Sequence, residues 1–335
     1  MLARSIAALL TFLPSWGLLE PSSLAADTAQ GLALERTIPL KNVTGRIDHM
    51  AVDLQRGRLA IAELGNDSVD IIDLGEGRVV HQITGLQAPQ GIAYAPAAGL
   101  LVVASAGDGS VRFFRAGDFL PAGQVNLGDD ADNIRMNGLT GHLLVGYGKG
   151  GLAVIDPVTR TKIADIALQA HPEGFQLAPD GGRAFVNVPD AQQVAVVDLV
   201  SGKQIASWRT PGVQSNFPMA IDGPGNTLAV AFRDPPRLLL LGTTSSSVVA
   251  NIETCGDADD VFFDSRRHRI YVSCGEGAVD VFDRSAGRLR RMAQVRTGPG
   301  ARTALFVPQL DRLFVASRSD AAGGDARLLV FRPSP

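Results

Sequence analysis

One pattern recurs seven times along this chain: a polar pair, a short apolar strand, a turn, a second apolar strand, a polar loop and a third strand. With the second residue of each first strand as a marker, the steps between markers are 42, 42, 41, 44, 42 and 43 residues. The markers are Met50, Ile92, Ile134, Phe175, Met219, Val261 and Ala304. Such regular spacing predicts a repeat architecture rather than two conventional domains.

A period near 42 residues is the length of one four-stranded propeller blade, whose sheet buries both faces only when neighbours stack against it. The apolar residues fall in short runs bounded by Gly, Asp, Asn or Pro, and no stretch after residue 31 keeps the spacing of a substantial helix. We therefore predict an all-β fold, a seven-bladed β-propeller of four-stranded antiparallel blades, as a single domain over residues 26–335. The blades are expected to start near residues 46, 88, 130, 171, 215, 257 and 300.

The last repeat is one strand short. Residues 301–332 contain three recognisable strands, whereas the segment 32–40, LALERTIPL, precedes the first blade without a partner. We expect residues 31–40 to supply the outer strand of the last blade. This closure would pair the two ends of the chain and leave no open sheet edge at the seam.

Two repeats carry a family resemblance. The fourth blade, with FVN at 185–187, and the sixth, with RIYVSC at 269–274, resemble the YVTN β-propeller repeat. The resemblance covers residues 31–332 and weakens in the second and fifth blades, which lack the D-x-x-x-G-K turn after the third strand. It implies a propeller that is exported or displayed at the cell surface, in a family with varied binding roles and some enzymatic ones. A WD-repeat propeller is disfavoured because neither tryptophan recurs with the period.

The N-terminus has the features of a secretory signal. Arg4 precedes an apolar stretch over residues 6–19, and Ser23 and Ala25 are small residues at the −3 and −1 positions of a cleavage site. We predict a signal peptide over residues 1–25 and a periplasmic or secreted protein, with retention as an N-terminal anchor as the alternative. No other segment reaches the roughly 20 apolar residues of a membrane span, so none is expected in the mature chain.

The chain has two cysteines, Cys255 and Cys274. In an oxidising compartment we expect them to form a disulfide, because both fall on the same side of one strand hairpin in the sixth blade. The bridge would hold the loop that carries Asp257, Asp259 and Asp260. A metal site built from the cysteines is disfavoured, since no C-x-x-C spacing occurs.

In a propeller the first strand of each blade lines the central channel, so the residues just before it gather on one face, which we call the mouth. Two positions before the markers stand Asp48, Gln90, Asp132, Glu173, Phe217, Asp259 and Arg302. One position before them stand His49, Gly91, Asn133, Gly174, Pro218, Asp260 and Thr303. The mouth is therefore predicted to be polar and largely acidic. Other charges end second strands near the mouth, at Glu63, Arg233 and Arg318. They could recognise an anionic group, with ordinary solvated loop charges as the expected alternative.

Three interpretations of these residues remain open. Clustered carboxylates suit a hard divalent cation, calcium or magnesium, with candidate ligands Asp48, Asp132, Glu173 and Asp259. Alternatively the mouth binds a cationic or polyhydroxylated small molecule directly, with candidate ligand-binding residues Asp48, Gln90, Asn133, Phe217, Asp260 and Arg302. In the third interpretation, the aspartates before the first strands only cap tight turns by accepting backbone N–H bonds.

Two functions follow from these interpretations. The first is an exported binding protein whose mouth takes a small molecule, a cation or a partner protein. The second is a metal-assisted lactonase or lyase in which His49 or His171 moves a proton, although a histidine hydrogen-bonded within the channel wall would need no such role. A net charge of −3 gives no field to attract nucleic acid. We expect no haem, because no C-x-x-C-H motif occurs, and no flavin or nucleotide, because the G-x-G-x-x-G string at 146–151 leads into a strand instead of a helix and no P-loop occurs.

Overall fold

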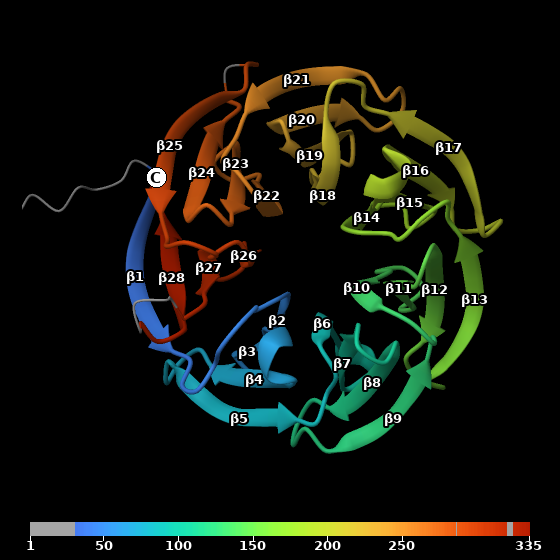
Figure 1. Ribbon diagram of the computed structural model, residues 1–335, viewed down its shortest axis with the longest axis vertical. Helices are drawn as coiled ribbons and strands as arrows, with labels where there is room; N and C mark the ends of the chain where they lie inside the picture. The colour runs from blue at the N-terminus through green and yellow to red at the C-terminus, as the bar shows by residue number, and fades with distance from the viewer. Residues whose placement is uncertain (1–30, 286, 320–323) are drawn as a thin grey trace, which may run out of the picture.

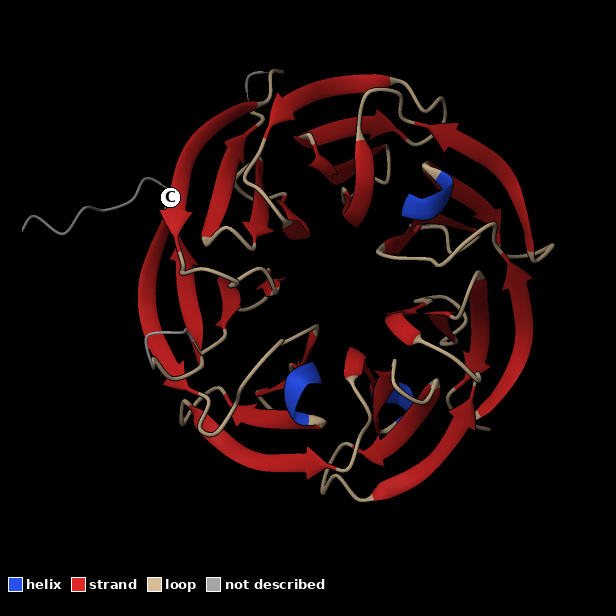
Figure 2. Ribbon diagram, viewed as in Figure 1, coloured by secondary structure: helices blue, strands red, loops and turns tan. Residues whose placement is uncertain are grey.

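The computed structural model describes residues 31–285, 287–319 and 324–335. These residues form seven four-stranded antiparallel sheets around a central axis (Figure 1), which confirms the predicted all-β, seven-bladed propeller. The only helical segments within them are three short 3₁₀ turns (Figure 2). The turns are η1 Leu64–Asn66, η2 Pro96–Ala98 and η3 Pro189–Ala191. The predicted signal peptide and its cleavage site lie outside the described residues.

Six blades consist of four consecutive strands, numbered outward from the channel. Blade 1 contains β2 Met50–Asp53, β3 Arg58–Glu63, β4 Ser68–Asp73 and β5 Arg78–Thr84. Blade 2 contains β6 Pro89–Ala95, β7 Leu100–Ser105, β8 Ser110–Arg115 and β9 Pro121–Asn126. Blade 3 contains β10 Ala131–Met136, β11 Leu143–Tyr147, β12 Gly151–Asp156 and β13 Thr161–Ala167.

The next three blades repeat this order. Blade 4 contains β14 Phe175–Leu177, β15 Arg183–Val188, β16 Gln193–Asp198 and β17 Lys203–Arg209. Blade 5 contains β18 Gln214–Ile221, β19 Thr227–Asp234, β20 Pro236–Gly242 and β21 Val248–Glu253. Blade 6 contains β22 Ala258–Asp264, β23 Arg269–Cys274, β24 Ala278–Asp283 and β25 Arg290–Arg296.

Blade 7 joins the two ends of the chain, as predicted. Its inner strands are β26 Ala304–Val307, β27 Arg312–Ser317 and β28 Arg327–Pro333, and its outer strand is β1 Leu32–Pro39. β1 pairs antiparallel with β28 from Leu32 opposite Pro333 to Pro39 opposite Arg327, with one irregularity in the register (Figure 1). The ring is therefore closed by hydrogen bonds between segments almost three hundred residues apart.

The strand sequences follow from where each strand lies in its blade. The second strands are covered on both faces by neighbouring blades, and β7 is buried at all six positions. The outer strands face solvent on one side, and β17 alternates between exposed and half-buried residues along its whole length. The core is accordingly distributed over the interfaces between blades.

Two glycines at the mouth allow close contact between blades. A Cβ atom at Gly91 would overlap the backbone carbonyl oxygen of Asp132 in the next blade, and one at Gly174 would lie 2.5 Å from the carbonyl oxygen of Phe217. No side chain fits at either position, since real Cβ contacts this short do not occur. The fold itself therefore requires glycine at these two of the seven positions before the first strands.

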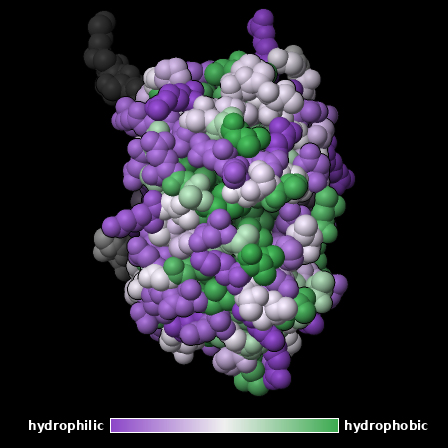
Figure 3. All heavy atoms as spheres, turned by 90° about the vertical axis from the view of Figure 1, so that its right-hand side faces the viewer, coloured by the Kyte–Doolittle hydropathy of each residue, from purple (hydrophilic) through white to green (hydrophobic). Residues whose placement is uncertain are grey.

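The outer wall of the ring is mixed in polarity. The side formed by β13 and β17 shows apolar atoms scattered among polar ones (Figure 3), and the exposed apolar residues on these strands include Ile163 and Ile205. In the part of the chain that the structure describes, no helix is long and apolar enough to cross a membrane.

Candidate functional site

The loops that enter the innermost strands converge on a hollow that opens to solvent, which we call the mouth hollow. Five of the seven blades contribute to its wall. The lining residues are Arg46, Asp48, His49, Asp132, Asn133, Arg135, Glu173, Gly174, Phe217, Pro218, Met219, Asp259 and Asp260. Five carboxyl groups thus face two guanidinium groups and one imidazole in a space that opens to solvent.

Most of the residues predicted for the site are brought together here. Asp48, His49, Asp132, Asn133, Glu173, Phe217, Asp259 and Asp260 all line the mouth hollow. Three others are not part of its wall but contact residues that are, or lie beside them. Gln90 accepts a 3.5 Å hydrogen bond from Arg46, Arg302 pairs with Asp259, and His171 lies next to Asp132.

Two histidines flank Asp132, one on each side. His49 Nε2 lies 3.9 Å from Asp132 Oδ1 and 3.6 Å from Asp48 Oδ1. His171 Nε2 lies 3.8 Å from Asp132 Oδ2, and its Nδ1 lies 2.6 Å from the carbonyl oxygen of Gly148. A carbonyl oxygen can only accept, so Nδ1 carries a proton. Imidazoles and carboxylates therefore alternate across the blade 1, 3 and 4 side of the mouth.

These carboxylates favour the protonated form of both imidazoles. Burial by itself would lower the pKa of His171, but its contacts with Asp132 and the Gly148 carbonyl and the charge of Asp130 raise the pKa to about 9. Burial likewise opposes protonation of His49, and the charges of neighbouring carboxylates, Asp48 foremost, outweigh it and raise the pKa of this histidine. His171 is therefore a cation at neutral pH, and the protonated form of His49 is favoured relative to a free imidazole.

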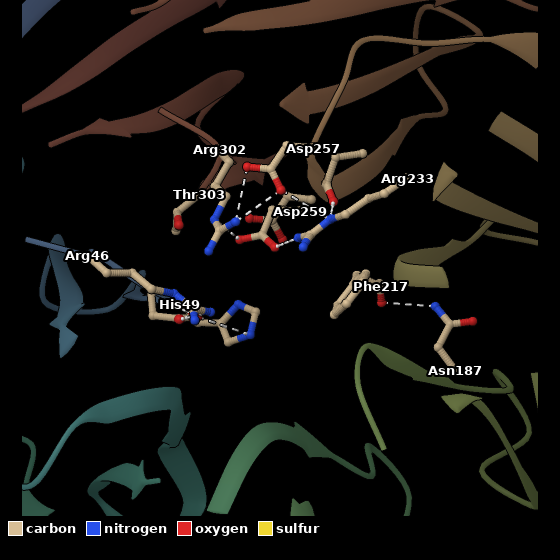
Figure 4. Close-up of polar contacts among 12 residues, drawn as sticks. Arg46, His49, Asn187, Phe217, Arg233, Asp257, Asp259, Arg302 and Thr303 are labelled. Atoms are coloured by element: carbon tan, nitrogen blue, oxygen red, sulfur yellow. Dashed lines mark hydrogen bonds and ion pairs between the residues drawn. The ribbon is translucent and has the colours of Figure 1, made fainter. Parts of the chain in front are cut away.

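The opposite side of the mouth is a neutral cluster of two arginines and two aspartates (Figure 4). Arg302 pairs with Asp257 at 3.0 Å and with Asp259 at 3.2 Å. Arg233 pairs with Asp257 at 3.3 Å and forms a shorter contact with Asp259. Its guanidinium carbon also lies 3.8 Å from the centre of the Phe217 ring, a cation–π contact. All four charges are compensated within the cluster.

The floor of the mouth hollow is formed by His49, Arg135 and Asp260, which also line a second cavity of ≈ 290 Å³ further down the channel. Asp260 accepts a 2.7 Å hydrogen bond from the backbone N–H of Ala304, yet burial raises its pKa to about 7. The lower cavity is mostly apolar in its lining, with Ile92 among the residues that form it.

Glu173 is held by its backbone alone. Its N–H donates to the carbonyl oxygen of Asn187 at 2.9 Å, and the Asn187 side chain donates to the Phe217 carbonyl oxygen at 2.9 Å, which ties blade 4 to blade 5. Within the described residues, the Glu173 carboxyl group has no hydrogen bond or ion pair. Burial and the nearby charge of Asp132 raise its pKa to about 7.

The turn-capping interpretation accounts for some of the aspartates and not for others. Asp48 accepts a hydrogen bond from the backbone N–H of His49 at 3.0 Å, within its own turn. Asp260 accepts one from Ala304 of the next blade, which is a contact between blades and not a turn cap. Among the described residues, the carboxyl groups of Asp132 and Glu173 accept no backbone N–H bond. Asp132 Oδ1 and Asn133 Oδ1 are in addition buried atoms without a hydrogen-bond partner in the described part of the chain.

The charges near the mouth depart from the sequence prediction in two ways. Glu63 is fully buried and Arg233 is ion-paired, so the expectation that both are solvated was wrong, whereas Arg318 is exposed as expected. Arg46 and Arg135 were not predicted to belong to the site. Arg135 could have been predicted from the alternation of side chains along a strand. Residues two positions apart share a face, and Arg135 is two residues beyond Asn133.

The four candidate metal ligands differ in their surroundings. Asp259 is paired with Arg233 and Arg302, and Asp48 is 2.7 Å from Arg46. No group of three or more His, Cys, Asp or Glu side chains in the described ranges is arranged to hold a metal ion. Binding of calcium or magnesium at the mouth stays a prediction.

The cysteine pair lies at the base of the loop that carries Asp257 of the neutral cluster. Cys255 and Cys274 lie at disulfide distance, with Cα atoms 5.8 Å apart, as the predicted bridge requires. The backbone N–H of Cys255 donates to Asp280 at 2.8 Å, and the next backbone N–H, of Gly256, donates to Glu276 at 2.7 Å. These contacts hold the loop from which Asp257 projects.

Comparison with known proteins gives a fold and no family. No protein-family model matches the chain, and no curated protein matches it. Among solved structures, a chain of Kuenenia stuttgartiensis hydrazine synthase superposes with a TM-score of 0.75 over 86% of this chain and 96% of that chain, at 16% sequence identity. At that identity the likeness shows the propeller fold alone, and the YVTN family stays a resemblance.

Proposed function

We propose that this propeller is an exported binding protein that holds a small polar molecule in the mouth hollow. The observation that carries the proposal is the pair of buried acceptors, Asp132 Oδ1 and Asn133 Oδ1, that line the hollow without a hydrogen-bond partner in the described residues. A buried polar atom left unpaired costs about 1–3 kcal/mol. A ligand that donates to these atoms recovers that cost.

The surroundings support a binding role in two further ways. The lining residues come from five blades of a closed ring, and the cysteine pair and the hydrogen bonds between blades fix the loops that carry them. Little conformational entropy is therefore lost when a ligand binds. The cysteine pair at disulfide distance is also typical of an oxidising compartment, which agrees with the signal peptide predicted for residues 1–25.

Amide resonances of the isotopically labelled mature protein test this proposal. We expect at least one class in a panel of amines, polyols, organic acids and divalent cations to shift the amides of Asn133 and Gly174 without shifting that of Gly141, which lies in a turn on the opposite face. A panel in which no compound perturbs the mouth amides would refute a small-molecule site.

A second function, the metal-assisted lactonase or lyase, is supported by the titrating groups. His49 lies between two carboxylates, and Glu173 and Asp260 have pKa values raised to about 7, which suits proton transfer near neutral pH. An enzyme of this kind would lose turnover of a lactone panel on chelation and in His49→Gln. A binding protein would show no turnover to lose.

A further inference from the structure

The hydrogen-bonding capacity of the mouth hollow is unbalanced. Its wall has three buried acceptor atoms without a hydrogen bond in the described residues: Asp48 Oδ2, Asp132 Oδ1 and Asn133 Oδ1. Asp48 Oδ2 is compensated by the Arg46 guanidinium group 2.7 Å away, which leaves Asp132 Oδ1 and Asn133 Oδ1. The half-buried carboxyl group of Glu173 also lines the wall without a hydrogen bond within the described residues. Asn133 is 3% exposed and the Asp132 side chain 8% exposed, so these two groups are enclosed by protein while they line the cavity. A ligand that satisfies them must supply donors.

The arginine and histidine donors of the lining are already directed elsewhere. Arg46 points its guanidinium group at Asp48, and Arg135 donates to the carbonyl oxygen of Ile134 at 2.8 Å. The nearest ring nitrogen of His49 is 3.9 Å from Asp132, beyond hydrogen-bond distance. The protein therefore does not itself fill the three acceptor groups.

The charge of the hollow favours a cation. Five carboxyl groups line it against two guanidinium groups and one imidazole, and Asp259 alone among the carboxyls is fully engaged by the arginine cluster. A calcium ion needs six to eight oxygen ligands around it, and no group of three or more His, Cys, Asp or Glu side chains in the described ranges is arranged to hold a metal ion. An organic ammonium ion needs fewer ligands and also brings N–H donors.

We propose, as a refinement of the binding function above and dependent on it, that the ligand is a small primary amine bound in its ammonium form by Asp132, Asn133 and Glu173. Its three N–H donors match the three acceptor groups in number. Its carbon chain lies toward Phe217, which projects into the open centre across from His49 (Figure 4). A quaternary ammonium ion has the same charge and no N–H donor, so it is the informative competitor.

Calorimetric titration of the mature protein with four probes tests the proposal: ethylammonium, tetramethylammonium and calcium, all as chlorides, and erythritol. We expect ethylammonium to bind at least about tenfold more tightly than tetramethylammonium, because charge-assisted hydrogen bonds are lost in the latter. Equal affinity for the two ammonium ions, or tighter binding of calcium or erythritol, would overturn the amine assignment.

Matched variants locate the binding. Glu173→Gln removes one charged acceptor and should weaken ethylammonium about tenfold or more. The control is Asp190→Asn, which removes the same charge from an exposed residue of η3 in the same blade and should change the affinity less than about twofold. Unchanged affinity in Glu173→Gln would count against the proposal. Asp132→Asn provides the same test if the first variant does not fold, with thermal melting as the check on folding.

The amine proposal and the binding function fail in different ways. If calcium or erythritol shifts the mouth amides and ethylammonium does not, the hollow is a binding site and the amine assignment is wrong. If none of the four probes and no member of the wider panel binds, both are wrong.

Discussion

The closure of the ring by β1 can be tested with two substitutions on that one strand. Ile38→Ala removes a side chain that is 1% exposed and packs at the seam between blades 7 and 1, in a cluster that includes Phe314 and Leu328. Leu34→Ala removes a side chain of the same size that is 56% exposed on the same strand. Both variants keep the β1 to β28 backbone pairing, so they differ in seam packing alone.

The expected difference is large because the two side chains lose different amounts of buried contact. Truncating a buried isoleucine to alanine costs about 2–5 kcal/mol through lost transfer free energy and the cavity left behind. Truncating an exposed leucine costs about 0.5 kcal/mol or less. Ile38 is among the most enclosed residues of the seam, so we expect about 3 kcal/mol for Ile38→Ala.

Urea denaturation followed by circular dichroism measures the unfolding free energy of each variant. Ile38→Ala should lower the denaturation midpoint without changing the slope, and should melt roughly 5–10 °C below the wild type. Leu34→Ala should unfold like the wild type. If the two variants had the same midpoint, β1 would contribute no packing to the seam, and the closure described here would be refuted.

Three other variants test the buried carboxyl group of Glu63, the disulfide and the glycine at position 91. Burial raises the pKa of Glu63 to about 8, from 4.5 for the free side chain. Between these pH values the folded protein keeps a proton on Glu63 that the unfolded chain releases. The free energy of unfolding therefore falls as the pH rises from about 4.5 to about 8. Glu63→Gln should therefore stabilise the protein by a few kcal/mol near pH 8.5 and hardly at all near pH 4.5, as measured by urea denaturation at both pH values. An equal change in unfolding free energy at both pH values would contradict the raised pKa of Glu63. Replacing Cys255 and Cys274 together by serine should cost about 3 kcal/mol in the same assay, and unchanged stability of the double variant would argue against a bridge. Gly91→Ala should destabilise the ring by more than the roughly 1 kcal/mol that an average point substitution costs, because its Cβ would overlap the Asp132 carbonyl. A wild-type melting curve for this variant would show that the two blades separate easily.

The fold was accessible from the sequence because each blade restates the same pattern. The 42-residue period, the continuous apolar runs of the second strands and the unpaired segment at residues 32–40 together determine a ring of seven blades with a closed seam. The disulfide followed from the hairpin that brings Cys255 near Cys274. None of these inferences required the orientation of a single charged side chain.

The sequence also allowed most of the residues that line the mouth to be predicted. It did not allow the ion pairs between them to be predicted. Counting back from the first strands identified Asp132, Asn133 and Glu173 as mouth residues, because the repeat places equivalent positions on one face. The partners of Asp259 are different in kind. Arg233 lies near the end of the second strand of blade 5, and Arg302 precedes the first strand of blade 7, on either side of Asp259 in blade 6. Their ion pairs with Asp259 depend on side chains that extend across two blade interfaces, which the repeat period does not encode.

The equivalence of the mouth positions sharpens the functional argument. Gly91 and Gly174 are dictated by contact between blades, Asp48 accepts a hydrogen bond from the next backbone N–H, and Asp260 accepts one from Ala304 of the next blade, so packing and backbone hydrogen bonds explain these four. Asp132 and Glu173 stand at the places in blades 3 and 4 that correspond to Asp48, yet no backbone donor in the described residues reaches either carboxyl group, and nearby charge and burial disfavour ionised Glu173. Asp132 pairs with His49 and His171, but its Oδ1 stays without a hydrogen bond in the described residues. Buried acceptors that no protein donor fills are best explained by a ligand. The case for function at the mouth therefore rests on these two carboxyl groups more than on the acidic character of the ring.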